Sequence, residues 1–272
     1  MQLQLFRFLP KQATEFLNEK KLWFSNILDF NDPFDAIPSS TQLANQIYDL
    51  LICRTSHGSL TPEEFRQILE TEKTRGVLIL TKIIQEQFGN YLGVLCFTTT
   101  NQFIPMWTYY ASKHEGFALE FNSEHPLFND RDFNPVNYSQ LRPQLPPNKQ
   151  PAEFYSKLSL TKSKDWIDEA EWRFVKPLNE LQSGTKSWNK KLGHYLSLPP
   201  DAIRAVYFGC KAPQEVTDAI ELSLRRPEYR DVKLFQMFPD PADYKFVPIP
   251  WQGIKTDFPD KVFEALSRKF PV

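Results

Sequence analysis

Cysteine and glycine are both scarce in this sequence. Its three cysteines stand far apart and show no CxxC spacing, which argues against a disulfide framework or a cysteine zinc site. No stretch approaches the roughly 20 apolar residues that a membrane span needs, and the first residues do not have the layout of a secretory signal. We therefore expect a cytoplasmic protein with no membrane partner.

A charge excess of either sign is also missing. The sequence has 32 Lys and Arg against 33 Asp and Glu, a net charge of -1, which gives no broad positive field for nonspecific binding to nucleic acid or anionic lipid. Proline and phenylalanine, by contrast, are abundant, with 22 and 23 residues among 272. Proline fixes connections and phenylalanine fills cores, so a rigid globular protein is expected.

The spacing of apolar residues predicts an α+β fold in a single domain over residues 1–272, with central mixed or antiparallel sheets. Strands are expected over residues 3–8, 22–25, 92–97, 117–121, 173–176, 195–198, 205–208, 232–238 and 246–249. Helical spacing predicts helices over 106–113 and 214–224, and a helical insertion near residues 40–90, where Thr61 to Glu64 has the composition of a helix start.

The segment of residues 164–173 is the densest in chemically active side chains, with four carboxylates, two indoles and two cations. If it enters a strand, the period of two puts Glu169, Glu171 and Arg173 on one face and Trp172 on the other. Two carboxylates and a guanidinium would then share a polar site. The alternative is an edge strand with solvated ion pairs, anchored by tryptophan.

Aromatic residues gather in the predicted helix 106–113. Trp107 and Tyr110 lie three residues apart and share a helix face. They are candidates for stacking on a planar ligand, although aromatic pairs at this spacing also commonly belong to a core.

Two further features are candidates for ligand binding. The turn Phe30-Asn31-Asp32-Pro33-Phe34-Asp35 offers Asn31, Asp32 and Asp35 to ribose hydroxyls or a metal, or else uses them as turn caps. Arg7 stands inside a short apolar strand, so it must face solvent or meet an anion such as a diphosphate.

Segments of this sequence resemble motifs of two protein families. The blocks FNDPFD, MWTYYA, DWIDEAEWRFV and AVYFGCKAP resemble those of a large family of uncharacterised bacterial proteins, over about residues 3–213. Separately, Arg7, the segment 97–100 with Thr98, and Glu169-Ala170-Glu171 resemble the arginine, serine and glutamate motifs of ADP-ribosyltransferases.

The second resemblance implies a split sheet and NAD as a substrate, with no metal. In that superfamily Arg7 would hold NAD, Thr98 would shape the nicotinamide pocket and Glu171 would contact the nicotinamide ribose, while Glu169 would orient a protein or nucleic-acid acceptor that the sequence does not identify. The chain departs from the pattern in having threonine where the middle motif has serine.

Two other functions use the same residues. In a metal-dependent phosphodiesterase or nuclease, Asp32, Asp35, Glu169 and Glu171 would converge on magnesium or manganese. In a non-enzymatic ligand-binding or immunity protein, the acidic and aromatic residues would form a groove. Only the transferase requires Arg7 near Glu171.

Overall fold

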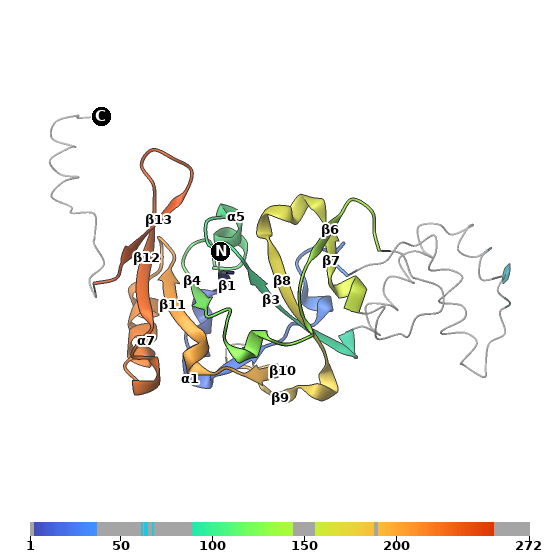
Figure 1. Ribbon diagram of the computed structural model, residues 1–272, viewed down its shortest axis with the longest axis horizontal. Coiled ribbons are helices and arrows are strands. Elements are labelled where there is room, and N and C mark those ends of the chain that lie inside the picture. Colours follow the sequence, from blue (N-terminus) through green and yellow to red (C-terminus); the bar gives the residue numbers. More distant parts are fainter. Residues whose placement is uncertain are drawn as a thin grey trace.

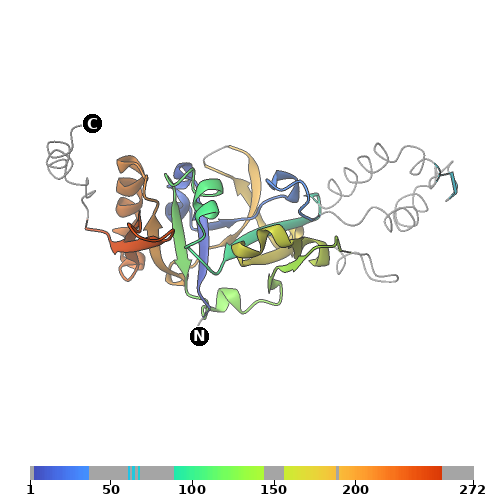
Figure 2. The ribbon, with the colours of Figure 1, turned by 90° about the horizontal axis from the view of Figure 1, so that it is seen from above.

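The computed structural model describes residues 3–36, 61, 63–64, 67, 89–143, 156–187 and 190–252. They form an α+β fold built on a mixed sheet of eight strands, in the order β13-β12-β11-β4-β1-β3-β8-β5 (Figures 1 and 2). These strands are β1 (Leu5–Leu9), β3 (Leu92–Thr98), β4 (Phe117–Phe121), β5 (Phe133–Pro135), β8 (Glu171–Pro177), β11 (Ile203–Phe208), β12 (Lys233–Pro239) and β13 (Phe246–Pro250).

The pairing of β1 is uneven on its two sides. Five residue pairs join β1 to β4, from Leu5↔Phe121 to Leu9↔Phe117, whereas a single pair, Phe6↔Thr98, joins β1 to β3. The next strand, β8, pairs with β3 along its whole length. Backbone groups of β3 that precede Thr98 therefore need partners other than β1.

Smaller elements surround the large sheet. A three-stranded sheet contains β2 (Lys21–Trp23), β10 (Leu192–Ser197) and β9 (Gln182–Thr185), and a parallel pair contains β6 (Asn137–Ser139) and β7 (Thr161–Ser163). The α-helices that the structure describes from end to end are α1 (Phe16–Glu19), α5 (Ile104–Tyr109) and α7 (Gln214–Leu224). The 3₁₀ helices of the described residues are η1 (Lys11–Ala13), η2 (Ile27–Asp29), η4 (Pro126–Phe128), η5 (Lys164–Glu169), η6 (Leu178–Glu180), η7 (Pro200–Ala202) and η8 (Pro227–Tyr229).

The phenylalanine-rich composition is explained by the main core. Phe97 makes edge-to-face contacts with Phe121, Phe128, Phe133 and Phe174, with ring centroids 5.2–6.1 Å apart. Each buried ring contributes about 1.5–3 kcal/mol by removing apolar area from water. This core holds β3 and β8 rigidly side by side, and the opposite face of those two strands carries the polar residues described below.

The α+β class and the nine predicted strands are confirmed, with ends shifted by up to three residues. The predicted helix 106–113 is wrong at its end, because α5 stops at Tyr109. Ser112, Lys113 and His114 then adopt left-handed backbone angles, which no α-helix can contain. Most of the predicted insertion at 40–90 lies outside the described residues.

One feature of that region is described. Residues 63, 64 and 67 are helical, and Thr61 and Glu64 exchange hydrogen bonds between side chain and backbone in both directions. This reciprocal arrangement is a capping box. It confirms the helix start predicted at Thr61.

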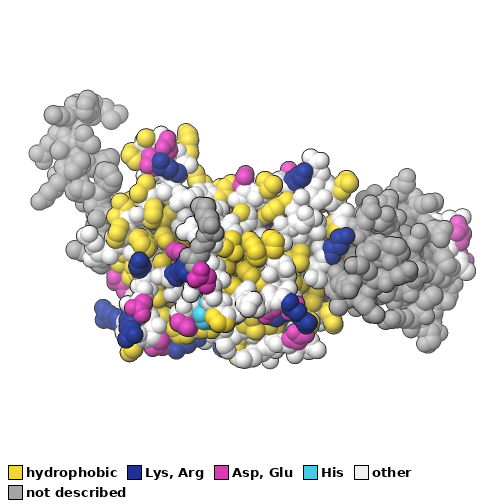
Figure 3. All heavy atoms as spheres, in the orientation of Figure 1, with side chains coloured by type: hydrophobic (Ala, Val, Ile, Leu, Met, Phe, Trp, Pro, Cys, Tyr) yellow, Lys and Arg dark blue, Asp and Glu magenta, His cyan; other side chains and the backbone are white. Residues whose placement is uncertain are grey.

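Within the described ranges, no helix is long and apolar enough to cross a membrane. On the face shown in Figure 3, basic and acidic side chains are interspersed among hydrophobic ones rather than gathered by sign. This distribution agrees with the near-zero net charge.

Candidate functional site

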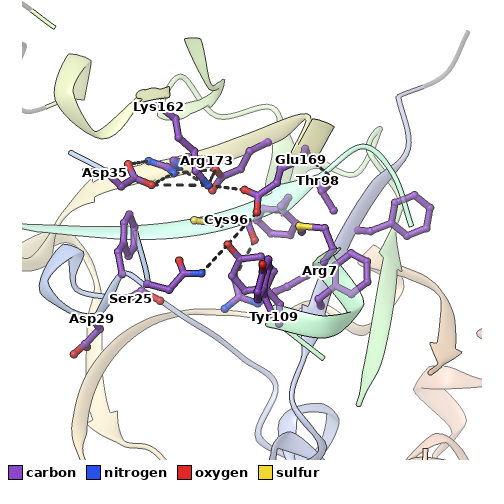
Figure 4. Close-up of a pocket in the computed structure, with 18 residues that line it drawn as sticks. Arg7, Ser25, Asp29, Asp35, Cys96, Thr98, Tyr109, Lys162, Glu169 and Arg173 are labelled. Atoms are coloured by element: carbon purple, nitrogen blue, oxygen red, sulfur yellow. Dashed lines mark hydrogen bonds and ion pairs between the residues drawn. The ribbon is translucent and has the colours of Figure 1, made fainter. Parts of the chain in front are cut away.

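Three adjacent strands bring the candidate residues to one cavity. Arg7 on β1, Thr98 at the end of β3 and Glu171 at the start of β8 all line a cavity of about 330 Å³ (Figure 4). Thr98 is the register partner of both Phe6 on β1 and Glu171 on β8. The volume is at the lower end of the range for small-molecule sites, about 300–1,000 Å³.

One wall of the cavity is an ion-pair cluster centred on Arg173, which is only 1% exposed. Its Nη1 and Nη2 donate to the two oxygens of Asp35 at 2.9 and 2.6 Å, and its Nε and Nη2 donate to those of Glu171 at 2.9 and 2.8 Å. Such two-pronged pairs are among the strongest in proteins and fix geometry as well as charge. Arg173 therefore holds both carboxylates in place.

A second buried cation completes the cluster. Lys162 on β7 donates from Nζ to Glu169 at 2.5 Å and to Glu171 at 3.1 Å, and its Nζ lies 3.9 Å from Asp35. Lys162 thus joins the end of η5 to the start of β8. Three carboxylates share two cations, which leaves one net negative charge.

The two glutamates differ in their acid–base properties. Burial would raise the pKa of Glu171, but the charges of Arg173 and Lys162 outweigh it and lower this pKa to about 2. Burial raises the pKa of Glu169, and the single cation Lys162 offsets this only in part. Neighbouring carboxylates with divergent pKa values suit different roles, one as a fixed charge and the other in proton transfer.

An aromatic hydroxyl binds the glutamate with the raised pKa. Tyr110 donates from its hydroxyl to Glu169 Oε1 at 3.1 Å, and Asn31 Nδ2 donates to the same hydroxyl at 3.4 Å. Burial and the negative charge of Glu169 keep the pKa of Tyr110 well above its ordinary value. Tyr110 is therefore a neutral hydrogen-bond donor that orients Glu169.

Arg7 is different from the other cations of the site. Its Nη2 donates to the Trp23 carbonyl at 3.2 Å and its Nη1 to the Cys96 carbonyl at 3.4 Å, where β3 no longer pairs with β1, while its buried Nε has no partner in the structure. No carboxylate of the described residues pairs with Arg7. In Figure 4 it lies apart from the ion-pair cluster.

Burial lowers the pKa of Arg7 to about 10. Arg7 stays charged at neutral pH, but burial makes this charge less stable than it is in water. An anion bound in the cavity would supply the missing countercharge, and a phosphate matches the guanidinium fork.

Replacing Arg7 with methionine is expected to raise the free energy of unfolding by about 1–3 kcal/mol, because an uncompensated buried charge is exchanged for apolar packing. Urea denaturation measures this change. Arg230→Met, at a site 81% exposed, is the control and should stay within about 0.5 kcal/mol. A loss of stability in Arg7→Met would show that the fold itself satisfies this charge.

The ion-pair cluster predicts a pH dependence of stability. The folded-state pKa of Glu171, about 2, lies below its ordinary value of 4.5, so its ionised form stabilises the fold at neutral pH. This contribution, on the order of 3 kcal/mol, is lost as the pH falls from about 4.5 through 2. Urea denaturation across this range should show a steeper loss for the wild type than for Glu171→Gln, and equal slopes would contradict the assignment.

The cavity brings together most of the residues singled out from the sequence. Its lining includes Arg7, Asn31, Asp35, Thr98, Tyr110, Glu169, Glu171 and Arg173. Glu171 and Arg173 share a strand face as predicted, but Glu169 ends η5 rather than lying on the strand, and Ala170 between them is left-handed. The Glu169 carboxylate reaches the site because the chain turns at Ala170.

Two predicted ligand contacts lie elsewhere. Trp107 is fully buried, donates from Nε1 to the Asn101 carbonyl at 2.8 Å and packs edge-on against Phe8, so it is a core residue rather than a wall of the cavity. Asp32 does not line this cavity but a second one. Thr98 lines the cavity, yet its hydroxyl donates to the Glu169 carbonyl at 2.5 Å, which makes it a support for Glu169.

The sequence did not indicate Lys162 or Cys96 as site residues. Both line the cavity, and burial raises the pKa of the Cys96 thiol, so this cysteine is a neutral neighbour of Glu171. The one available signal for Lys162 was its position shortly before the acidic segment, which is too common a pattern to single it out.

Three of the four carboxylates proposed as metal ligands converge, all but Asp32, and they do so around cations of the chain. Lys162 Nζ lies within 4 Å of Asp35, Glu169 and Glu171, where a divalent ion would have to sit. In the part of the chain that the structure describes, no group of three or more His, Cys, Asp or Glu side chains is arranged to hold a metal.

Comparison with known proteins gives one match. A family model described as a protein of unknown function (DUF2971) matches residues 106–174, which run from α5 into β8. This match is consistent with the resemblance to an uncharacterised family and carries no activity. No curated protein and no solved structure matches the chain.

Proposed function

We propose that the cavity binds NAD and that the protein cleaves the bond between nicotinamide and ribose, transferring the ADP-ribosyl group to an acceptor or to water. The observation that carries this proposal is the meeting of Arg7, Thr98 and Glu171 at one cavity, on three adjacent strands. They come from the three motifs that resemble those of ADP-ribosyltransferases.

The break in strand pairing supports the same proposal. β1 and β3 are neighbours in one continuous sheet of eight strands, but they pair at one position only. Arg7 lies where this pairing stops: its guanidinium donates to the Cys96 carbonyl, and its Nε is unsatisfied within the described residues. A diphosphate has the charge and the oxygen geometry that this group requires.

The charge distribution of the cavity fits the two ends of NAD. The dinucleotide carries an anionic diphosphate and a cationic nicotinamide ring, while the cavity offers an unpaired Arg7 and a cluster with one net negative charge. Tyr109 and Phe30 add aromatic walls, against which a planar ring can pack. The nicotinamide ribose would lie near Glu171.

The chemistry requires a fixed negative charge and a proton acceptor. As nicotinamide departs with the electrons of the C–N bond, positive charge develops on the ribose, and ionised Glu171 stabilises it. The acceptor forms its bond to the same ribose carbon and gives its proton to Glu169. The pKa of Glu169, raised by burial, suits it to this exchange.

The experiment that tests the proposal is the incubation of purified protein with NAD, with nicotinamide and ADP-ribose products followed by chromatography. Release of nicotinamide above the rate without protein is expected. If NAD binds but stays intact for any acceptor offered, the protein is a binding module. This second function is favoured by the closed ion pairs of Glu171, which neutralise the charge that catalysis would use.

A further inference from the structure

We propose that a second cavity is a binding site for an organic cation, a guanidinium or ammonium group on an apolar stem. The cavity, of about 290 Å³, lies between the turn that contains Asp32 and Phe34, residues 139–143 from the end of β6 onward, and residues of β7 and the start of η5. It shares one lining residue, Lys162, with the cavity proposed to bind NAD, and it does not depend on that proposal.

The first observation is an unsatisfied carboxylate. Asp32 is 7% exposed, and its Oδ1 accepts from the Phe34 amide at 2.8 Å, as in an Asx turn. Its buried Oδ2 has no hydrogen-bond partner in the structure. By comparison, Asp35 has both oxygens paired with Arg173. A buried carboxylate oxygen without a donor is costly, and a cationic donor from a ligand is the group that satisfies it best.

The walls of the cavity suit the apolar stem of such a ligand. Phe34 and Leu141 are 62% and 76% exposed, although both are large and hydrophobic, and Trp166 lines the same cavity. Thr161 and Ser163 line it as well. Exposed apolar side chains around a buried polar anchor are the usual composition of a ligand site.

The aromatic rings of this cavity already attract cations of the chain. The Arg142 guanidinium carbon lies 5.2 Å from the Phe34 ring centroid, and Lys162 Nζ lies 5.1 Å from that of Trp166. Both distances are typical of cation–π contacts. The contact of Arg142 with Phe34 shows that a guanidinium group fits against this ring. Asp32 Oδ2 has no partner among the described residues and could bind a second cation.

The charges that line the second cavity also favour a cationic ligand. Lys162 is neutralised by Glu169 and Glu171 on its other side, so the remaining charges of the lining are Asp32, Asp165 and Arg142. Two carboxylates against one cation leave a net negative charge. An incoming cation is favoured and an anion is not.

The test is a calorimetric titration of the full chain with n-butylguanidinium and with its neutral analogue of the same shape, n-butylurea. The wild type should bind the cation at least about tenfold more tightly than the urea, since a charge-assisted hydrogen bond to a buried carboxylate discriminates by this factor or more. Asp32→Asn should weaken binding of the cation by about tenfold or more. Its amide oxygen can still accept from Phe34, so the turn is kept.

Asp168→Asn is the matched control, because Asp168 is exposed and belongs to the lining of neither cavity. The affinity of the Asp168→Asn variant for n-butylguanidinium should stay within about twofold of wild type. Thermal unfolding of each variant establishes that it is folded. Equal affinity for both probes, no binding of the cation, or unchanged binding in folded Asp32→Asn would overturn the proposal, whatever the outcome with NAD.

Discussion

Replacing Glu171 with glutamine is expected to slow the release of nicotinamide from NAD by about 100- to 1,000-fold, the usual effect of removing one preorganised group that stabilises transition-state charge. Burial and two neighbouring cations place Glu171 where it is ionised at neutral pH. Glutamine keeps the shape and accepts hydrogen bonds, but it does not balance positive charge on the ribose. The loss should fall on kcat rather than on NAD binding.

Glu180→Gln is the control for this comparison, since Glu180 is exposed in η6 just after the same strand. Its rate of nicotinamide release should equal that of wild type within about twofold, because surface substitutions away from a site are near neutral. Release by folded Glu171→Gln at the wild-type rate would remove Glu171 from the mechanism.

Replacing Arg173 with methionine is expected to lower the free energy of unfolding by about 3–5 kcal/mol, because Asp35 and Glu171 would remain buried without their shared cation. For a protein of this size the melting temperature should fall by roughly 10 °C. Calorimetry or circular dichroism measures both quantities. This is the largest effect on stability expected of any single substitution in the cluster.

Arg131→Met provides the matched control. Arg131 is 88% exposed at a long ion pair with Asp132, and its loss should change the free energy of unfolding by no more than about 0.5 kcal/mol. The double variant Arg173→Met with Asp35→Asn should regain part of the lost stability, since the two sites are coupled. A stability equal to wild type for Arg173→Met would mean that the cluster is not held by this cation.

The residues that could be placed from the sequence are those governed by strand period. Glu171 and Arg173 are two positions apart, and β8 puts them on one face, while Trp172 faces the core beside Phe133. Likewise, the charge of Arg7 inside an apolar run indicated that this side chain must face solvent or meet an anion, and the structure places it in the lining of the cavity. Both conclusions follow from local geometry and the energetic cost of burial.

The parts that could not be predicted depend on where the chain turns. Trp107 and Tyr110 share a face only while the helix continues, and α5 ends at Tyr109, which sends Trp107 into the core and Tyr110 to the cavity. Lys162 reaches the site because the short strand β7 runs beside β6, a contact that no periodicity in the sequence indicates. Long-range pairing, rather than local pattern, decides these positions.

Arg7 is proposed to bind the diphosphate of NAD. The most direct test is calorimetric titration of NAD into wild type and Arg7→Met. Arg7→Met is expected to be at least as stable as wild type, so a binding defect cannot be attributed to unfolding. Wild type should bind NAD, and Arg7→Met should bind it about tenfold or more weakly, the effect of losing a charge-assisted pair. Equal affinity in both proteins, or no binding by wild type, would contradict the claim.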